Sequence, residues 1–307
     1  RSGCFIALLP LVHFVQEVAG ATAPGRESVR ACSMFDDPNL HWPSFGYIDF
    51  REMLRCASSG SGFDASIATV PLDAWYSHPP TVKLFQDNPQ HLSLLIHGND
   101  HVKRELARAY SEAARDALVA QSLRRIERLE SVTGLSVARV MAAPHAACTD
   151  AMGSALLRFG YQGACISRAA LMAANAEMDW PVAVGLRPAE FIGGGLPVIP
   201  RFGLSMHSQA SMVIAAFLGQ PVILVGHHDD LAGGYGVLGE LADFINSLGP
   251  VRWMDLTAIA RSNHRLTTWG SSAWLDLYSR SVEFMIPPDV GTLLVRRPWM
   301  AEDAAPE

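Results

Sequence analysis

Two histidines four residues apart, His97 and His101, offer the clearest chemistry in this sequence. They follow an apolar run of strand type, residues 92–96, and we expect a helix to begin near His101 with Asn99 or Asp100 as its N-cap. A spacing of four lets two imidazoles converge on one point, as a metal ion requires of histidine ligands. An isolated pair at this spacing also occurs in ordinary polar loops, so the interpretation depends on the other ligands near it.

Acidic and imidazole side chains also follow other apolar runs. Asp36 and Asp37 come directly after residues 29–35, although an Asp-Pro sequence also favours a plain turn. Because the carboxyl ends of barrel strands meet at one face, which carries the chemistry in α/β barrels, we expect these groups to lie together. Further histidines at predicted strand ends are those of Pro144-His145 and His227-His228.

One carboxylate with two imidazoles is a ligand set typical of catalytic zinc, which keeps a fourth position open for water. A bound metal lowers the pKa of that water, a neighbouring carboxylate can take its proton, and another imidazole can protonate a leaving group. The strand ends therefore favour a hydrolytic site with a divalent metal, for which zinc is expected.

The elements that must position these groups alternate between strand and helix over residues 30–260, which is typical of a parallel sheet or an α/β barrel. Residues 169–202, rich in glycine and proline, are expected to form a long functional loop. We divide the chain into a barrel over residues 1–262 and a small β-rich extension over residues 263–307. Three short strands are expected in the extension, at residues 273–278, 282–286 and 292–297.

Composition excludes several classes of function. The 307 residues are 49% hydrophobic, and their formal net charge is −6, so no nucleic-acid partner is expected. The apolar stretch 4–18 is short and interrupted by polar residues, so we expect no membrane span. The five cysteines are scattered and lack metal spacing, which favours a reducing compartment, and we expect a cytoplasmic protein. The sequence does not indicate an oligomeric state.

Five short motifs, in their order along residues 29–262, resemble the NodB-type polysaccharide deacetylases, the family-four carbohydrate esterases. In that family a distorted (β/α) barrel holds a divalent metal, usually zinc, and hydrolyses N- or O-acetyl groups on sugars. The motifs in this sequence are Phe35-Asp36-Asp37, His97-x3-His101, the strand end with Pro144, Asp179-Trp180 and Ile223-Leu224-Val225-Gly226-His227.

The resemblance implies a role for each motif residue. Asp36 would be the catalytic base, and Asp37, His97 and His101 would be the metal ligands. The acid that protonates the leaving group would be one of two neighbours, His227 or His228. Substrate contacts are assigned to the third and fourth motifs, at Pro144, His145, Asp179 and Trp180.

The sequence departs from the family pattern in two places. The family usually has Asp-Asp-Gly-Pro in its first motif, whereas here Pro38 follows Asp37 directly. The family also places an arginine close before the proline of its third motif, but here Arg139 lies further from Pro144. This second departure leaves open which cation holds the base in its charge state.

Two other functions fit part of the pattern. A glycoside hydrolase-like barrel without metal would need two carboxyl groups facing each other across a cleft at about 5–10 Å. A non-catalytic carbohydrate-binding relic of the deacetylase fold would bind a glycan without hydrolysing it. Tryptophans in predicted loops near the mouth could stack on sugar rings or could simply be buried, and these are Trp42, Trp75 and Trp180.

Overall fold

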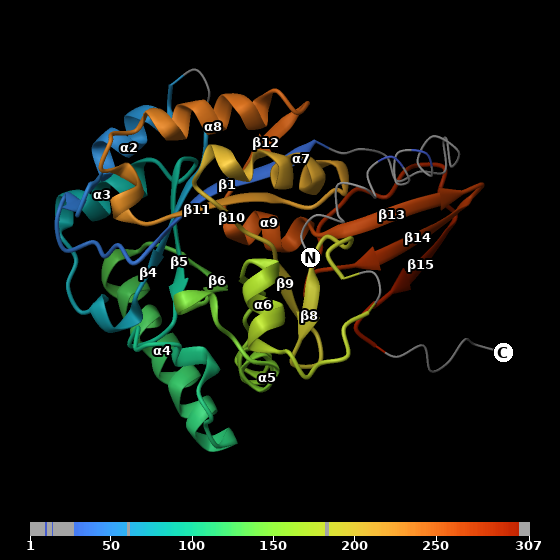
Figure 1. Ribbon diagram of the computed structural model, residues 1–307, viewed down its shortest axis with the longest axis horizontal. Helices are drawn as coiled ribbons and strands as arrows, with labels where there is room; N and C mark the ends of the chain where they lie inside the picture. The colour runs from blue at the N-terminus through green and yellow to red at the C-terminus, as the bar shows by residue number, and fades with distance from the viewer. Residues whose placement is uncertain (1–9, 11–13, 15–27, 60–61, 182–183, 301–307) are drawn as a thin grey trace.

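A sheet of ten mostly parallel strands forms the centre of the fold (Figure 1). The computed structural model describes residues 28–59, 62–181 and 184–300, together with Pro10 and Phe14. The strands are β1 (Val29–Asp36), β4 (Ala65–Thr69), β5 (Leu92–His97), β6 (Val137–Ala142), β7 (Gly163–Cys165), β8 (Glu190–Ile192), β9 (Leu196–Ile199), β10 (Phe202–Gly203), β11 (Val222–Gly226) and β12 (Val251–Trp253).

The order of the strands curls the sheet into a distorted barrel. Neighbours run β10-β11-β1-β4-β5-β6-β7-β9-β8, and β12 pairs with the start of β1. Only β8 is antiparallel to its neighbour among these pairs. The chain passes from β9 to β10 through Pro200 and Arg201 alone, so β9, the last strand but one of the hydrogen-bonded path, continues directly into the strand at the opposite end. The predicted α/β class and the curled barrel of parallel strands are confirmed.

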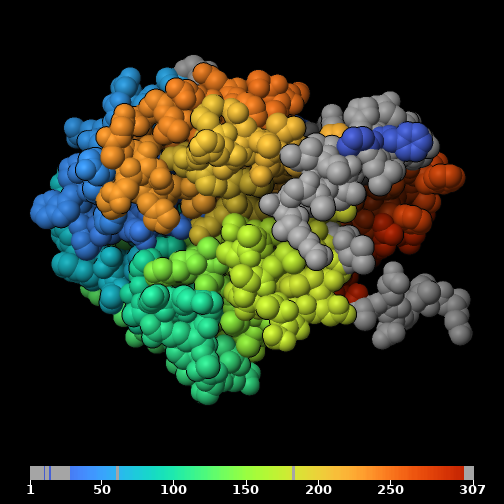
Figure 2. Space-filling view, viewed as in Figure 1, coloured from blue at the N-terminus to red at the C-terminus, as the bar shows by residue number. Residues whose placement is uncertain are grey.

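Both faces of the strands are buried, which explains why they are apolar without alternation. Residues such as Met34, Ala68 and Leu95 fill the barrel interior, whereas Phe35 and Ile96 face the surrounding helices. The helices are α2 (Phe50–Ala57), α3 (Pro79–Asp87), α4 (Glu112–Thr133), α5 (Asp150–Arg158), α6 (Arg168–Ala174), α7 (Gln209–Phe217), α8 (Gly236–Asn246) and α9 (Leu256–Ser262). One end of α4 projects beyond the rest of the molecule (Figures 1 and 2).

The prediction of a long loop over residues 169–202 is wrong. This stretch contains α6, β8 and β9, and β9 lies in the main sheet between β7 and β8. The glycines that suggested a loop form instead a tight hairpin between β8 and β9, and Gly193 and Gly194 adopt φ of 61° and 75° there. The segment was misread because turn residues were concentrated in the connections of short strands.

A separate three-stranded sheet follows the barrel and lies beside it in Figure 1. It contains β13 (His264–Trp269), β14 (Ser272–Leu277) and β15 (Thr292–Arg296). The strand predicted at residues 282–286 is wrong, because that stretch takes no strand pairing and β13 supplies the third strand instead. The boundary at residues 262 and 263 stays a prediction. Among the described residues, no helix has the length and apolar composition needed to cross a bilayer.

An acidic residue is buried near the amino ends of the strands. Asp64 Oδ1 accepts hydrogen bonds from Ser66 Oγ at 3.2 Å and Ser93 Oγ at 3.4 Å, and the thiol of Cys32 lies 3.6 Å away. Burial, reinforced by the charge of Asp255, raises the pKa of Asp64 to about 7. The folded chain therefore keeps a proton that the unfolded chain releases.

We expect the free energy of unfolding to fall as pH rises from about 4 to about 7, and Asp64→Asn to remove this decrease. In that window the unfolded carboxyl is ionised while the buried one is protonated, so the folded state binds more protons. Urea unfolding of the wild type and the variant at several pH values measures the difference. Asp289→Asn, at an exposed position, is the control. Identical pH dependence in the wild type and Asp64→Asn would contradict the assignment.

Candidate functional site

Three of the predicted residues converge at the carboxyl edge of the sheet. Asp37 follows β1 directly, His97 ends β5, and His101 lies in the loop after β5. The Nε2 atoms of His97 and His101 lie 3.2 Å and 3.1 Å from Asp37 Oδ1. One ligand atom from each residue lies within 4.8 Å of the others, which is the arrangement that a bound metal ion needs.

The hydrogen bond of His97 to the backbone sets which of its nitrogens is available. Its Nδ1 lies 2.9 Å from the carbonyl oxygen of Ala142 on the neighbouring strand β6, so this nitrogen carries the proton and donates it. The Nε2 lone pair of the neutral ring then points toward Asp37. A second contact that fixes the ring and its tautomer is typical of histidines that bind metal.

The electrostatics of the three residues fit a cation between them. Asp37 Oδ1 is buried and accepts no hydrogen bond within the described part of the chain. Burial raises the pKa of Asp37, but the imidazoles of His97 and His101 outweigh it and lower that pKa overall. Burial likewise opposes protonation of His97, yet the carboxylates of Asp36 and Asp37 raise its pKa overall. A divalent cation would satisfy the same carboxylate that the imidazoles face.

The loop that carries His101 is closed by a buried glutamate. The carboxylate of Glu105 accepts the backbone N–H groups of Asn99 at 2.9 Å and Asp100 at 2.7 Å. Gly98 has φ of +66°, and a Cβ there would lie 2.3 Å from Glu105 Oε2, so this corner requires glycine. The loop therefore turns back on itself before any helix starts.

The predicted helix start near His101 is consequently wrong. The long helix α4 begins at Glu112, and its N-cap is Ser111, whose hydroxyl accepts the N–H of Ala114. Asn99 and Asp100 do not cap it, because their side-chain oxygens accept hydrogen bonds from Arg125 Nη1. His101 itself lies in the left-handed region with φ of 55°.

Asp36 is held by an arginine that the sequence analysis missed. Arg201 Nη1 donates to Asp36 Oδ2 at 2.8 Å, and both side chains are buried. Among the residues that the structure describes, Asp36 Oδ1 has no hydrogen-bond donor, and it lies 4.0 Å from His97 Nδ1. Arg139, the arginine nearest the third motif, is bound instead to Glu130 of α4. The cation beside the candidate base is thus Arg201.

Arg201 was missed because it lies in the stretch expected to be a loop. A signal was nevertheless present, since the apolar run 196–199 is followed by Pro200 and Arg201, the same pattern of apolar run and polar end that identified Asp36. The sequence could have placed Arg201 at a strand end. Its pairing with Asp36, 165 positions away, required the closed barrel.

The two candidate acids, His227 and His228, differ in their surroundings. The ring of His228 packs edge-on against Phe45 and stacks on Tyr47, with centroid distances of 5.6 Å and 6.1 Å. The side chain of His227 is more exposed, at 55%, and its charge acts on Asp37. Because His228 is packed among aromatic rings and His227 is open to solvent, His227 is the better candidate for the acid.

The third predicted motif lies against the metal ligands. The ring of His145 lies 5.0 Å from that of His101, and its Nδ1 accepts the N–H of Arg104 at 3.4 Å. Pro144 is buried, and its Cγ lies against Gly98. Pro144 therefore supports the loop from below, whereas the imidazole of His145 stands next to His101.

The fourth predicted motif is not brought into contact with the ligands in the described structure. Asp179 is exposed, in the connection after α6. Trp180 is partly buried, and its indole N–H donates to the carbonyl of Asn175 at 3.2 Å. Substrate binding by Asp179 and Trp180 stays a prediction.

Exposed aromatic rings surround the same edge of the sheet. Trp42 and Trp75 are each 66% exposed, and Tyr76 is 43% exposed. They lie on the connections after β1 and β4, which His41 ties together by a contact of 2.6 Å between its Nε2 and the carbonyl of Asp73. The rings of Trp75 and Tyr76 lie 5.1 Å and 5.8 Å from the ring of His41. These aromatic side chains are therefore held in place while remaining open to solvent.

Comparisons with known proteins give structural likeness only. No protein-family model matches the chain. No curated protein matches its sequence. Among solved structures, it is similar to a family 4 carbohydrate esterase from Streptomyces lividans in complex with acetate, at 14% identity and a TM-score of 0.44 over 74% of this chain and 93% of that one.

Two other similar structures show that the likeness extends both to a protein described as an enzyme and to a pseudoenzyme. A Mycobacterium smegmatis protein provisionally described as a polysaccharide deacetylase has 16% identity and a TM-score of 0.46, over 75% of this chain and 87% of that one. A CE4 family pseudoenzyme from Bacillus anthracis has 11% identity and a TM-score of 0.41, over 73% of this chain and 61% of that one. Likeness at such low scores assigns neither an activity nor a substrate.

We expect the purified chain to bind about one equivalent of zinc or a similar divalent ion, and His97→Ala/His101→Ala to lose it. The double variant removes two of the three candidate ligands and leaves Asp37 alone. Elemental analysis after loading with metal and dialysis gives the metal content. His145→Ala removes a neighbouring imidazole outside the ligand set and should retain the metal. Equal metal content in the wild type and the double variant would rule out this site.

Proposed function

We propose that this chain is a metal-dependent hydrolase that removes acetyl groups, N- or O-linked, from a sugar or polysaccharide. The observation that carries the proposal is the Asp37-His97-His101 cluster beside a buried carboxylate held by Arg201. The choice of an acetylated sugar follows from the motifs that resemble the NodB-type deacetylases. The surroundings of each residue suggest its role.

Asp37, His97 and His101 would hold the divalent metal, with zinc expected. These three protein ligands leave at least one position open, as catalytic zinc sites do. When bound, the metal would lower the pKa of a water molecule and polarise the acetyl carbonyl. His97 is preorganised for this task, because its hydrogen bond to the Ala142 carbonyl places the proton of the neutral ring on Nδ1 and leaves Nε2 for the metal.

Asp36 would take the proton of the attacking water. Arg201 occupies its Oδ2 at 2.8 Å, which leaves Oδ1 without a hydrogen bond on the side of His97. A carboxylate with one oxygen fixed and the other free is oriented for proton transfer. His227, exposed beside Asp37, would protonate the leaving amine or alkoxide.

The aromatic rings at the mouth support a carbohydrate substrate. Trp42, Trp75 and Tyr76 are exposed together on the connections at the candidate catalytic edge, and a group of exposed aromatic side chains is typical of a binding surface. Sugar rings present apolar faces with polar rims, and flat aromatic side chains match that shape. The connection after β4 is also tied to the metal-binding loop, because Leu72 N–H donates to the Asn99 carbonyl at 2.9 Å.

The metal-free glycosidase has less support from this geometry. Its mechanism needs two carboxyl groups available to a glycosidic bond from opposite sides. Here Arg201 binds Asp36, and two imidazoles face Asp37. These two carboxylates are adjacent in the chain and serve different partners, which suits a base and a metal ligand.

We expect Asp36→Asn to lower kcat for acetate release about 100-fold or more while metal content stays near the wild-type value. The substitution removes the proton acceptor but leaves Asp37, His97 and His101 in place. Acetate release from acetylated chitooligosaccharides and acetylated xylan measures the loss. If the wild type binds these glycans but releases no acetate with metal bound, the chain is a binding relic.

The acetate-release measurement also tests whether Arg201, and not Arg139, positions the candidate base. Arg201→Met should lower kcat, because Asp36 loses the partner that orients it. Arg139→Met removes the same charge from the pair with Glu130 and should leave kcat unchanged. Equal activity of both arginine variants would contradict the positioning role of Arg201. Circular dichroism separates a loss of activity from a loss of fold, since breaking a buried ion pair also destabilises the chain.

We expect Trp75→Ala to raise KM for an acetylated oligosaccharide several-fold, with kcat changed little. The ring lies outside the metal cluster, so its removal takes away binding shared by substrate and transition state. Initial rates with a monosaccharide and an oligosaccharide separate the two contributions. Trp269→Ala, at an exposed tryptophan of the three-stranded sheet, is the matched control. An unchanged KM in Trp75→Ala would exclude that residue from substrate binding.

A further inference from the structure

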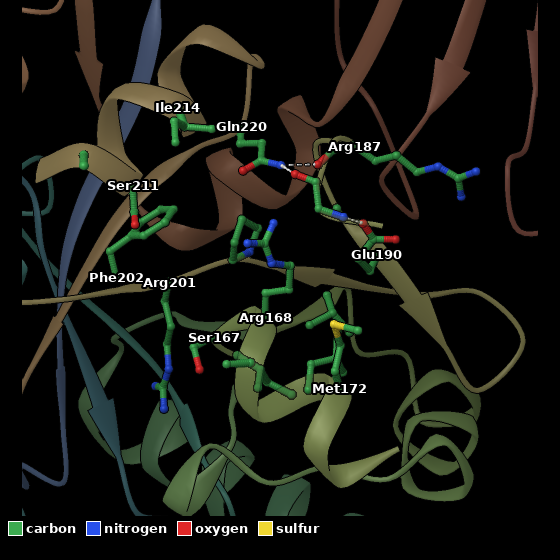
Figure 3. Close-up of a pocket in the computed structure, with 18 residues that line it drawn as sticks. Ser167, Arg168, Met172, Arg187, Glu190, Arg201, Phe202, Ser211, Ile214 and Gln220 are labelled. Carbon is green, nitrogen blue, oxygen red and sulfur yellow. Dashed lines mark hydrogen bonds between the residues drawn. The ribbon is translucent and has the colours of Figure 1, made fainter. Parts of the chain in front are cut away.

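The groups of the candidate site are supported from two sides. On one side, Arg201 lies on the wall of a cavity of about 590 Å³ between α6 and α7, and its guanidinium points out of this cavity toward Asp36 (Figure 3). None of the proposed metal ligands lines the cavity. On the other side, the loop that carries His101 is held by groups that bind its backbone, and the acid among them is Glu105. The support of His101 is therefore separate from the arginine that holds the base.

Glu105 is a fully buried acid whose hydrogen-bond partners are backbone N–H groups. Its Oε2 accepts the N–H of Asn99 at 2.9 Å, and its Oε1 accepts the N–H of Asp100 at 2.7 Å. Within the described part of the chain, no lysine or arginine forms an ion pair with this carboxylate. Burial of a carboxylate is unfavourable unless hydrogen bonds compensate it, so the folded loop depends on these two N–H groups. The backbone just before His101 is thereby fixed.

Helix α4 fixes the first residues of the same turn. Ser122 Oγ donates to the carbonyl of Gly98 at 2.9 Å, and Arg125 Nη1 donates to Asn99 Oδ1 at 2.7 Å. The beginning of the turn is consequently attached to the helix, whereas among the described residues α4 makes no hydrogen bond with residues 101–105.

The second half of the turn contains His101 and is strained. His101 and Arg104 both take left-handed backbone conformations, with φ of 55° and 51°, which residues other than glycine rarely adopt. The N–H of Glu105 donates to the carbonyl of Val102 at 2.9 Å, and the side chain of Glu105 reaches back to the beginning of the turn, which is bound to the helix. Glu105 therefore connects the two halves of the turn, and His101 lies between the connected ends.

We propose that Glu105 is a positioning residue of the metal site, because the turn that it closes holds His101 Nε2 at 3.1 Å from Asp37 Oδ1. The inference rests on the metal site of the proposed function and not on its substrate. His97 should not depend on Glu105, since it lies on β5 and its ring is held by the Ala142 carbonyl. Loss of Glu105 should therefore displace one metal ligand and leave the other two in place.

The metal affinity of Glu105→Gln tests the proposal without any substrate. Glutamine keeps the size of the side chain, but its single carbonyl oxygen can accept only one of the two N–H groups, and its amide nitrogen faces the other. We expect the affinity for Zn²⁺, measured by competition with a chromophoric chelator, to fall about tenfold or more. The absorption spectrum of bound Co²⁺ should change as well, because it reports the geometry of the ligands.

Glu130→Gln is the matched control. Glu130 lies on α4, and its carboxylate likewise accepts a backbone N–H, that of Val137 at 2.9 Å, while it pairs with Arg139. The substitution removes the same charge outside the turn and should leave the zinc affinity near the wild-type value. If circular dichroism shows that Glu105→Gln does not fold, Glu105→Asp takes its place. Aspartate keeps the charge but is one methylene group shorter, so this variant should also lose affinity.

A second background shows whether Glu105 acts through His101. His101→Ala leaves Asp37 and His97 as ligands, so Glu105→Gln should weaken zinc binding in the wild-type background but change it less than about twofold in the His101→Ala background. An equal loss in both backgrounds, or equal affinities of the wild type and Glu105→Gln, would overturn the positioning role alone. A wild type that binds no zinc would overturn the metal site and this inference with it. Because these readouts need no acetate release, they remain valid if the proposed hydrolase activity fails.

Discussion

The buried ion pair between Asp36 and Arg201 joins the two parts of the chain that must meet for the barrel and the site to exist. Asp36 ends β1 in the middle of the sheet, and Arg201 lies in the link between β9 and β10, where the sheet closes on itself. Both side chains are almost fully buried. Removing either partner would leave a buried charge uncompensated, which typically costs about 3–5 kcal/mol. The same contact therefore favours closure of the barrel and orients the carboxylate beside the candidate metal ligands.

Much of the barrel could be predicted because its strands are encoded locally. The apolar run predicted at residues 92–96 forms β5, which extends one residue further to His97; the run was recognisable because it is buried and bounded by polar or turn residues. Asp36, Asp37, His97 and His101 could be grouped because parallel strands bring their carboxyl ends to one edge. The choice of Asp37 as the carboxylate of the ligand set came from the family resemblance.

The features that the sequence analysis missed depend on contacts between residues that are distant in the chain or on turns whose residues resemble those of a loop. The misplaced start of α4 also depends on a distant residue, because an N-cap at Asn99 is locally reasonable, but its side-chain oxygen accepts from Arg125 and the helix begins only at Glu112. Arg201 shows the first, since nothing near it in the chain indicates Asp36 as its partner. The hairpin of β8 and β9 was hidden by its own turn residues, whose sequence signal is the same in a long loop and in a tight connection.

Backbone strain is concentrated around the candidate metal ligands. Within the described residues, the non-glycine positions with positive φ are Asp37, His101, Arg104, His145 and Ala146. Each such conformation costs on the order of 1 kcal/mol or more and persists only where the surroundings impose it.

The surroundings that impose this strain can be identified. Glu105 holds the N–H groups of the loop that carries His101, Arg125 binds Asp100, and Pro144 fills the space beneath Gly98. A fold selected for stability alone would relax these turns by placing glycine there. Their strained residues instead point imidazole and carboxylate groups at one another. Binding of a cation between those groups would offset the cost of the strained backbone. Strain, the position of Asp37 Oδ1 between two imidazoles and the tautomer of His97 thus all fit the candidate metal site at this edge of the sheet.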